Sequence, residues 1–365
     1  MELYNLGKVP WDESQLIYHA LASLGRECLC LVSPDRPFVC VGFHQDLHQE
    51  VDLTYCHSRN IPIFRRNLGG GAVYLDGNQL FFQLVLKREN PVVPKRKEVF
   101  YRKFLQPIIE VYRHLGIFAE YKPINDVVVG TRKISGTGVG EMGDCIVFVG
   151  NLIVDFDYER MAKVLKVPDA KFRDKIHKTL RENLSTIRRE LGTEEANRWD
   201  EPALNALMAQ AFQRLLGTMT TRPRDPALQK KMEELRALML TDAWLQQKGK
   251  RTGGREIKIR AGINLVQKMF KATGGLIRAE YEIREGRFHN VSLSGDFFCF
   301  PAEAVGRLEG RLEGVYLGEA ADVLEIFFRD ESVEMPGIGK GDWLKVLEPY
   351  PSPGWQLRGY DAGAP

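Results

Sequence analysis

The sequence feature that most constrains the fold is a run of three glycines, Gly69–Gly71, which lies between Arg65-Arg66 and an apolar segment. Glycine allows positive φ and lets main-chain N–H groups approach a ligand closely. Consecutive N–H groups of this kind form an anion-binding concavity. The arginines add positive charge and bidentate donors suited to phosphate or carboxylate. The segment predicts either a nucleotide-binding loop or a glycine-rich hairpin turn with surface arginines.

The residues around this run exclude two common phosphate-binding loops. A P-loop of the form GxxxxGK[ST] has a lysine after its last glycine, whereas Ala72 follows Gly71 here. A Rossmann fingerprint opens a helix, whereas Ala72-Val73-Tyr74 reads as an apolar strand. A nucleotide site at this position therefore requires a different scaffold.

The length of the chain predicts two domains, because 365 residues exceed the usual size of a single hydrophobic core. A composition of 44% hydrophobic and 27% charged residues is typical of globular domains. Prolines and polar residues between Thr218 and Pro226 suggest the boundary. We expect a large N-terminal domain at 1–220, a linker with a helix at 221–250, a smaller domain at 251–350 and a tail at 351–365.

Hydrophobic periodicity predicts an α+β order of elements. Apolar residues at helical spacing predict a helix at Asp12–Leu24 and another at Lys97–Leu115, with a kink at Pro107. Strict alternation through Gly275–Phe300 predicts a β-hairpin that turns at Glu285-Gly286. Strands and helices do not alternate regularly, so the order does not favour a βαβ fold.

A second segment with candidate chemistry runs from Asn125 to Gly138 and reads NDVVVGTRKISGTG. Asp126 heads an expected strand and is a candidate magnesium ligand, because Mg²⁺ prefers carboxylates and phosphates. Lys133 is a candidate for contact with a substrate carboxylate and the α-phosphate, where an ammonium group would neutralise developing charge. A β-turn with a solvated lysine explains the same residues. Gly130–Asp144 is expected to be a polar connection between two strands.

Bulk composition narrows the function classes. The net charge is +3 from 51 basic and 48 acidic residues, which does not favour nucleic-acid binding. No apolar run approaches the length of a membrane span, and the N-terminus lacks the pattern of a signal peptide. Six cysteines without a paired spacing predict reduced thiols. We therefore expect a cytoplasmic protein that binds neither nucleic acid nor membrane.

Taken together, the two segments resemble the lipoate–protein ligase family, which shares a fold with biotin–protein ligases and octanoyl transferases. The pattern is Arg-Arg-x-x-Gly-Gly-Gly-Ala-Val-Tyr, followed by Asn-Asp and then by Arg-Lys-Ile-Ser-Gly. The resemblance covers residues 1–216 and extends to 255–345, where Lys271-Ala-Thr-Gly-Gly275 precedes the hairpin. It implies an α+β fold: a biotin/lipoyl ligase-like catalytic domain with a mixed β-sheet and flanking helices, plus a small α+β C-terminal accessory domain.

The resemblance also implies roles for individual residues. Lys133 would be the catalytic residue that contacts the lipoyl carbonyl and the phosphate, and Asp126 would assist through magnesium or the ribose. The dithiolane and acyl chain need an apolar slot, for which Leu68 and Val127, with Phe43 and Phe148, are the candidates. The implied ATP and lipoyl-AMP site comprises Arg66, Gly69, Gly70, Gly71, Ala72, Val73, Tyr74, Asp76, Asn78, Asp126 and Lys133.

The implied reaction has two steps and uses ATP, Mg²⁺ and lipoic acid. Lipoate is first activated to lipoyl-AMP, and the lipoyl group then passes to a lysine of an acceptor lipoyl domain. The acceptor would belong to a 2-oxoacid dehydrogenase subunit or a glycine-cleavage H-like protein. Adenylation activates the acyl group, so no protein nucleophile is needed and catalysis rests on positioning and charge neutralisation.

The chain departs from the family pattern at two places. Val149 stands where such ligases commonly carry the histidine of a His-Gly pair, and the stretch Tyr74–Asn78 is one residue shorter and also lacks a histidine. Substrate preference is therefore left open. One alternative is an octanoyl or lipoyl transferase that uses Cys145 as a thioester nucleophile and needs no ATP. Biotin–protein ligase and a non-catalytic carrier-binding protein are further alternatives. His44 and His48 are expected to be surface or loop histidines.

Overall fold

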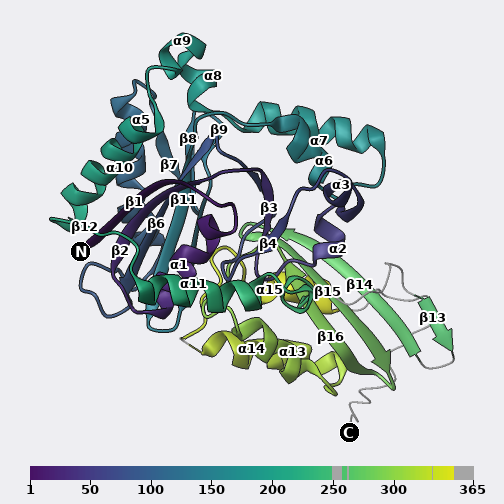
Figure 1. Cartoon of the computed structure of the whole chain (residues 1–365). Coiled ribbons are helices and arrows are strands. Elements are labelled where there is room, and N and C mark those ends of the chain that lie inside the picture. The colour runs from purple at the N-terminus through teal and green to yellow at the C-terminus, as the bar shows by residue number, and fades with distance from the viewer. Residues whose placement is uncertain (249–256, 261–262, 331, 349–365) are drawn as a thin grey trace, which may run out of the picture.

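The computed structural model describes residues 1–248, 257–260, 263–330 and 332–348, and its elements form two parts, each built on a sheet of its own (Figure 1). The larger part contains a six-stranded sheet in the order β10-β11-β6-β2-β1-β12. β1 pairs in parallel with β2 and β12, and the other pairs are antiparallel, so the sheet is mixed as expected. The strands are β1 Glu2–Val9, β2 Cys28–Pro34, β6 Gln79–Lys87, β10 Thr137–Met142, β11 Cys145–Ile153 and β12 Thr220–Thr221.

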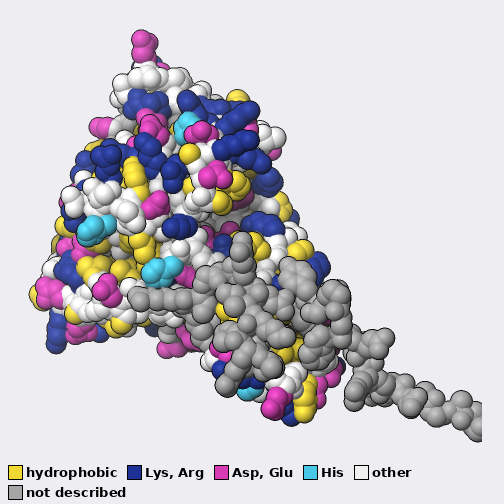
Figure 2. Space-filling view, turned by 90° about the vertical axis from the view of Figure 1, so that its right-hand side faces the viewer, with side chains coloured by type: hydrophobic (Ala, Val, Ile, Leu, Met, Phe, Trp, Pro, Cys, Tyr) yellow, Lys and Arg dark blue, Asp and Glu magenta, His cyan; other side chains and the backbone are white. Residues whose placement is uncertain are grey.

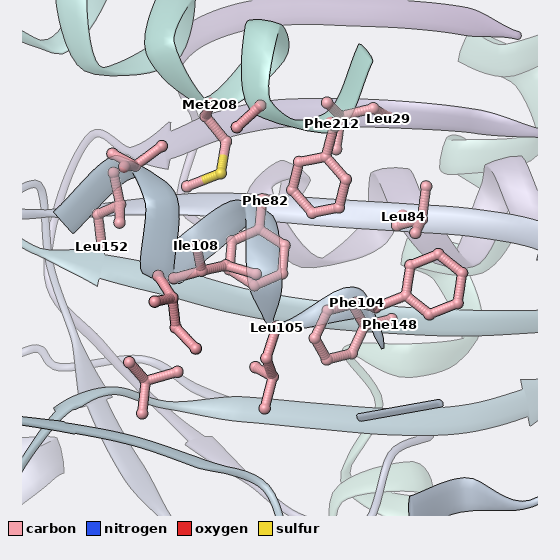
Figure 3. Close-up of a cluster of buried hydrophobic side chains, with 14 of the residues drawn as sticks. Leu29, Phe82, Leu84, Phe104, Leu105, Ile108, Phe148, Leu152, Met208 and Phe212 are labelled. Carbon is pink, nitrogen blue, oxygen red and sulfur yellow. The ribbon is translucent and has the colours of Figure 1, made fainter. Parts of the chain in front are cut away.

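Helices cover both faces of this sheet, and its central strands β2, β6 and β11 accordingly carry apolar residues on both faces. Successive side chains of a strand point to opposite faces. In β6, Phe82 therefore joins the core on one face with Phe148 and Phe212 (Figure 3), whereas Phe81 and Val85 join the core on the other face. The first face packs against α4 Lys97–Phe104, α5 Gln106–His114 and α10 Glu201–Leu216, and the second against α1 Glu13–Ser23 and α11 Pro226–Met239.

Two small three-stranded sheets carry the two segments singled out in the sequence. In the first, β5 begins at Val73, two residues after the last glycine of the run, and pairs with β3, which also pairs with β4. In the second, β8 and β9 form a hairpin that holds Asp126 and Lys133. The strands are β3 Phe38–Val41, β4 Ile63–Arg65, β5 Val73–Leu75, β7 Glu120–Lys122, β8 Asp126–Val129 and β9 Arg132–Ser135.

The remaining helices of the larger part are short, apart from α7. α7 has no buried residue and carries Lys171, Lys175, Lys178 and Arg181, and lysine and arginine side chains are numerous on this side of the molecule (Figure 2). In the described part of the chain, no helix has the length and apolar character to cross a membrane. These helices are α2 Leu47–Glu50, α3 Leu53–Ser58, α6 Tyr158–Val164, α7 Ala170–Asn183, α8 Ile187–Leu191, α9 Thr193–Ala196 and α12 Asp242–Leu245.

The smaller part is a four-stranded antiparallel sheet covered by helices, with a core of its own. The predicted hairpin corresponds to β15 and β16, and Ile277, Ala279, Tyr281 and Ile283 face the core as their alternation predicts. The predicted tail at 351–365 lies outside the described residues. The elements are β13 Ile257–Arg260, β14 Ile263–Ala272, β15 Gly275–Arg284, β16 Arg287–Gly295, α13 Ala304–Leu312, η1 Leu317–Glu319, α14 Ala320–Arg329 and α15 Lys340–Leu347.

Three local expectations need revision. The single kinked helix at Lys97–Leu115 is two helices, and Pro107 lies in the first turn of α5, where its missing N–H costs no hydrogen bond. The polar connection at Gly130–Asp144 contains β9 and β10; β10 is an edge strand, where polar residues and glycines mask the strand pattern. The helix expected in the linker is α11, and it packs against the larger part: its Leu228 and Met232 are buried in the same core cluster as the apolar residues of α1.

Candidate active site

A cavity of about 380 Å³ lies between the two parts, in the size range of small-molecule sites. The glycine run, the β8–β9 hairpin, β10 and β11 form its wall on the larger part, and the β14–β15 turn with the segment after β16 closes it from the smaller part. Of the residues implied by sequence, the structure brings six together here: Arg66, Gly70, Gly71, Val73, Asp126 and Lys133.

The glycine run forms a loop whose carbonyl groups accept hydrogen bonds from the side chain of Arg66. Gly70 has a φ of +89°, a conformation that glycine adopts at little cost. Arg66 Nη2 donates to the carbonyls of Gly69 and Gly71 at 2.8 and 2.9 Å, and Nη1 donates to the carbonyl of Cys40 at 3.2 Å. The Gly70 N–H donates to the Phe297 carbonyl of the smaller part at 3.1 Å. In this arrangement the Gly70 N–H is therefore committed to a protein acceptor.

Arg65, expected beside Arg66 as a source of charge, is a structural residue. Its side chain is fully buried, and burial lowers the pKa of the guanidinium to about 10. It donates to main-chain carbonyls on either side, namely those of Gly42, Phe43, Gln45 and Leu245. Arg65 thus joins the turn after β3 to the end of α12 and does not line the cavity.

Lys133 and Asp126 form an ion pair on the cavity wall. Their strands are antiparallel neighbours, and Lys133 Nζ lies 2.6 Å from Asp126 Oδ1. The two side chains are 36% and 31% exposed, so the pair is accessible to a ligand. The Ser185 N–H donates to the Lys133 carbonyl at 2.8 Å and anchors the strand behind it. An anionic ligand can therefore reach the ammonium group by displacing a carboxylate.

The inner wall of the cavity combines apolar and polar side chains from elements far apart in sequence. Gln15 and Tyr18 come from α1 and Gln83 from β6. Gln83 Nε2 donates to the Ser14 carbonyl at 2.6 Å, and its buried Oε1 has no hydrogen-bond partner among the described residues. Sequence reasoning missed these residues because nothing in the local pattern marks them.

The other residues implied by sequence do not line this cavity. Leu68 and Val127, expected as lipoate contacts, are buried in the two cores, and Phe43 and Phe148 are likewise absent from the wall. The apolar wall comes instead from Leu75, Phe81, Val149 and Phe298. The residues of the implied ATP and lipoyl-AMP set that lie outside the wall are Gly69, Ala72, Tyr74, Asp76 and Asn78.

Three of these residues have roles in the surrounding structure. The buried Tyr74 hydroxyl accepts a hydrogen bond from Arg160 at 3.2 Å. Asp76 Oδ1 accepts from the Asn78 N–H at 2.9 Å, and burial raises the pKa of the Asp76 carboxyl. Asp76 and Asn78 line a second depression, which they share with Asp155. Asp76 and Asn78 thus belong to the turn between β5 and β6, and their hydrogen bond stabilises it.

The smaller part contributes polar groups to the cavity that sequence reasoning did not assign. Lys271, Thr273 and Gly275 come from the end of β14 and the turn into β15, and Asp296 and Phe298 follow β16. Lys271 Nζ lies 3.5 Å from Asp296 Oδ2. The cavity is therefore lined by two Lys–Asp pairs, one from each part of the molecule.

The described residues contain no cluster of three or more histidine, cysteine, aspartate or glutamate side chains that would hold a metal ion by themselves. Asp126 and Asp296 are the carboxylates that line the cavity among these residues. Magnesium is commonly held by one or two carboxylates together with substrate phosphates. This donor set therefore fits a magnesium ion that arrives with a nucleotide, and it does not fit a resident metal.

Two residues discussed from sequence lie outside the wall of this cavity. Cys145 is buried at the start of β11, where burial raises the pKa of its thiol. His44 is a loop histidine, but it is buried, and its ring stacks on Phe297 with centroids 4.9 Å apart. His44 thus belongs to the contact between the two parts.

The mixed sheet and its flanking helices have the α+β architecture of solved lipoate–protein ligases. Within this class, the chain belongs to the family of the lipoyl protein ligase A/B catalytic domain, whose model matches residues 9–213, more than half of the chain. The matched span includes the glycine run and the β8–β9 hairpin.

Curated relatives include both ligases and transferases. The chain is 30% identical over 187 residues to lipoate–protein ligase 1 of Staphylococcus aureus, covering 51% of each chain. It is 26% identical over 291 residues to a lipoate–protein ligase of Streptococcus pyogenes, covering 79% of this chain and 80% of the relative. It is also 26% identical over 257 residues to the octanoyltransferase LipM of Kyrpidia tusciae, covering 64% of this chain and 91% of that protein. The match spans about half the length of the Staphylococcus relative.

Solved structures share the fold at low sequence identity. LipL1 of P. falciparum, solved in complex with lipoate, has a TM-score of 0.67 at 16% identity and covers 91% of this chain and 95% of its own. The bipartite lipoate protein ligase of Thermoplasma acidophilum has a TM-score of 0.59 at 24% identity and covers 69% of this chain and 98% of its own. A lipoate-protein ligase A bound with ATP has a TM-score of 0.55 at 21% identity, covering 67% of this chain and 97% of that one.

Proposed function

We propose that this protein is an ATP-dependent lipoate–protein ligase that makes lipoyl-AMP and transfers the lipoyl group to a lysine of an acceptor protein. The observation that carries the proposal is the Lys133–Asp126 pair, which lies with the glycine loop on one cavity wall inside the span matched by the family model. Relatives named lipoate–protein ligases and a similar fold solved with ATP support it.

In the first step, a lipoate carboxylate oxygen attacks the α-phosphorus of ATP. A new acyl–oxygen–phosphorus link forms, the bond to the bridging oxygen breaks, and pyrophosphate leaves. Two anions must approach each other, so the reaction needs positive charge at the reacting centre. We assign this role to Lys133, whose ammonium group leaves Asp126 to contact the carboxylate and the α-phosphate. Arg66 keeps the glycine loop in shape beside it.

In the second step, the ε-amine of the acceptor lysine attacks the acyl carbon of lipoyl-AMP. The amide bond forms as the bond to the AMP oxygen breaks, AMP leaves, and the amine loses a proton. The mixed anhydride is already activated, so the protein mainly orients it. The apolar wall formed by Leu75, Phe81 and Val149 is suited to an acyl chain.

Magnesium would enter with the nucleotide phosphates and would be held by Asp126 or Asp296, where it would offset phosphate charge. Residues 1–220 would act as the catalytic domain and 251–350 as the accessory domain. The acceptor would be a lipoyl domain of a 2-oxoacid dehydrogenase subunit or a glycine-cleavage H-like protein. The Thermoplasma structure, described as a lipoate protein ligase and its E2 lipoyl domain, supports a lipoyl domain as the acceptor. The six unpaired cysteines support a cytoplasmic location.

The test uses the purified chain with lipoate, ATP, magnesium and an apo lipoyl domain, and the intact mass of the domain is the readout. We expect the mass of one lipoyl group to be added only when ATP is present. Omission of ATP and replacement of ATP by a non-hydrolysable α,β-methylene analogue serve as controls. Lipoylation that proceeds equally without ATP would overturn the ligase assignment.

An octanoyl or lipoyl transferase that uses Cys145 is the second candidate, because octanoyltransferases named LipM are among the relatives. This reaction would form a thioester on Cys145 before transfer. The Cys145 thiol is buried and outside the cavity wall, which argues against this use. The Cys145→Ala variant separates the two functions: the ligase keeps its activity, whereas the transferase loses it.

A further inference from the structure

The cavity is complete only where the smaller part is docked on the glycine loop. The Gly70 N–H donates to the Phe297 carbonyl at 3.1 Å, and the Gly295 N–H donates to the His44 carbonyl at 3.0 Å. His44 stacks on Phe297 between these two hydrogen bonds. These contacts hold the end of the β14–β16 sheet over the loop, so groups at that end face the same space as Lys133.

Among the described residues, three cationic side chains line the cavity, and they differ in how strongly other protein groups hold them. Arg66 donates to three main-chain carbonyls of the loop and its neighbouring strand. Lys133 lies 2.6 Å from Asp126 and is 36% exposed. Lys271 lies 3.5 Å from Asp296 and is 66% exposed. Lys271 is therefore the cation that can most readily exchange its partner for an incoming anion.

The ion pair of Lys271 contributes little to the fold. Solvent screens exposed ion pairs of this kind, and Asp296 also accepts a hydrogen bond from the N–H of Leu276. Adenylation, however, requires positive charge to neutralise negative charge at two points. The α-phosphate meets a carboxylate, and the departing pyrophosphate gains negative charge as its bond to the α-phosphorus breaks. The attacking carboxylate and the leaving pyrophosphate lie on opposite sides of the phosphorus in an in-line displacement, so a cation on each side favours the reaction.

We propose that Lys271 binds the β- and γ-phosphates of ATP across the cavity from Lys133 and stabilises the pyrophosphate leaving group. This inference rests on the proposed ligase function and deepens it. Lys271 exchanges Asp296 for phosphate when ATP enters, and the smaller part thereby supplies one half of the nucleotide site. After pyrophosphate has left, Lys271 has no phosphate to hold. Its contribution is therefore confined to the first step, and transfer from lipoyl-AMP does not use it.

The experiment measures the two steps separately in the full-length chain. ATP–pyrophosphate exchange in the presence of lipoate reports adenylation, and acylation of an apo lipoyl domain from synthetic lipoyl-AMP reports transfer. For Lys271→Ala we expect kcat/KM for ATP in the exchange reaction to fall by roughly 10²-fold, the scale of removing one charge-stabilising donor. The transfer rate stays within about twofold of wild type. Lys271→Arg, which keeps the charge, retains most of the exchange activity.

Lys340→Ala is the matched control, because it removes a lysine from the same part of the molecule. Lys340 Nζ lies 2.8 Å from Glu325 and outside the cavity wall, and both measured rates should match the wild type. Wild-type exchange kinetics in Lys271→Ala would overturn the inference, as would equal losses in both steps, which indicate a purely structural role. If the wild type itself shows no exchange, the proposed ligase function fails before this question arises.

Discussion

Removal of the Lys133 ammonium group should separate stability from catalysis. In Lys133→Met, the side chain keeps its length and loses its charge. The Lys133–Asp126 pair is about one-third exposed on each side, so its loss should cost no more than about 1 kcal/mol of folding free energy. For a chain of this size, that corresponds to a fall in the melting temperature of no more than about 4 °C. Asp126 remains partly exposed and is not left as a buried unpaired charge.

The expected effect on adenylation is much larger. Removal of one preorganised donor at a developing charge typically costs 10²–10³ in rate, or about 3–4 kcal/mol. We therefore expect ATP–pyrophosphate exchange to fall at least about 100-fold in a variant that unfolds near the wild-type temperature. Lys163→Met is the control, since Lys163 forms a 2.5 Å pair with Glu159 outside the cavity and should leave the exchange rate unchanged. A folded Lys133→Met protein with more than about one-tenth of wild-type exchange would refute the role assigned to Lys133.

Gly70→Ala should lower the melting temperature and raise KM for ATP, because Gly70 has a φ of +89° and a Cβ there would lie 3.0–3.1 Å from Phe298 and Arg66; wild-type values for both would contradict the loop geometry. Cys145→Ala should keep at least half of the ATP-dependent lipoylation, measured by acceptor mass. Burial lowers the pKa of His44 to about 3. Neutral His44 therefore contributes its full share of folding stability above about pH 6.5, and this contribution is lost as the pH falls towards 3. The urea midpoint should fall less steeply from pH 6.5 to 4.5 in His44→Phe than in wild type, and identical slopes would exclude His44 as a contributor.

The parts of the site that sequence predicts are those formed by local structure. Asp126 and Lys133 lie seven positions apart in one segment, and a hairpin between adjacent strands brings them together. The glycine loop is likewise local, and the positive φ of Gly70 and the bracing by Arg66 agree with its composition. The hydrophobic periodicity of β15 correctly placed its apolar face against a core.

The parts that sequence could not predict depend on long-range packing. Gln15 and Gln83 meet at the inner wall only because α1 covers one face of the six-stranded sheet. Leu68 and Val127 are apolar neighbours of the two segments, yet their side chains point into the cores. The position of Lys271 depends on how the smaller part docks against the glycine loop, and no local pattern encodes that contact.

The proposed chemistry depends on one intermediate, and its direct detection is the most decisive measurement. The chain would be incubated with lipoate, ATP and magnesium without any acceptor, then quenched and analysed by mass spectrometry for bound small molecules. The proposed function predicts lipoyl-AMP together with an equal amount of pyrophosphate. An acylated protein side chain in place of lipoyl-AMP, or lipoate and ATP recovered unchanged, would contradict it.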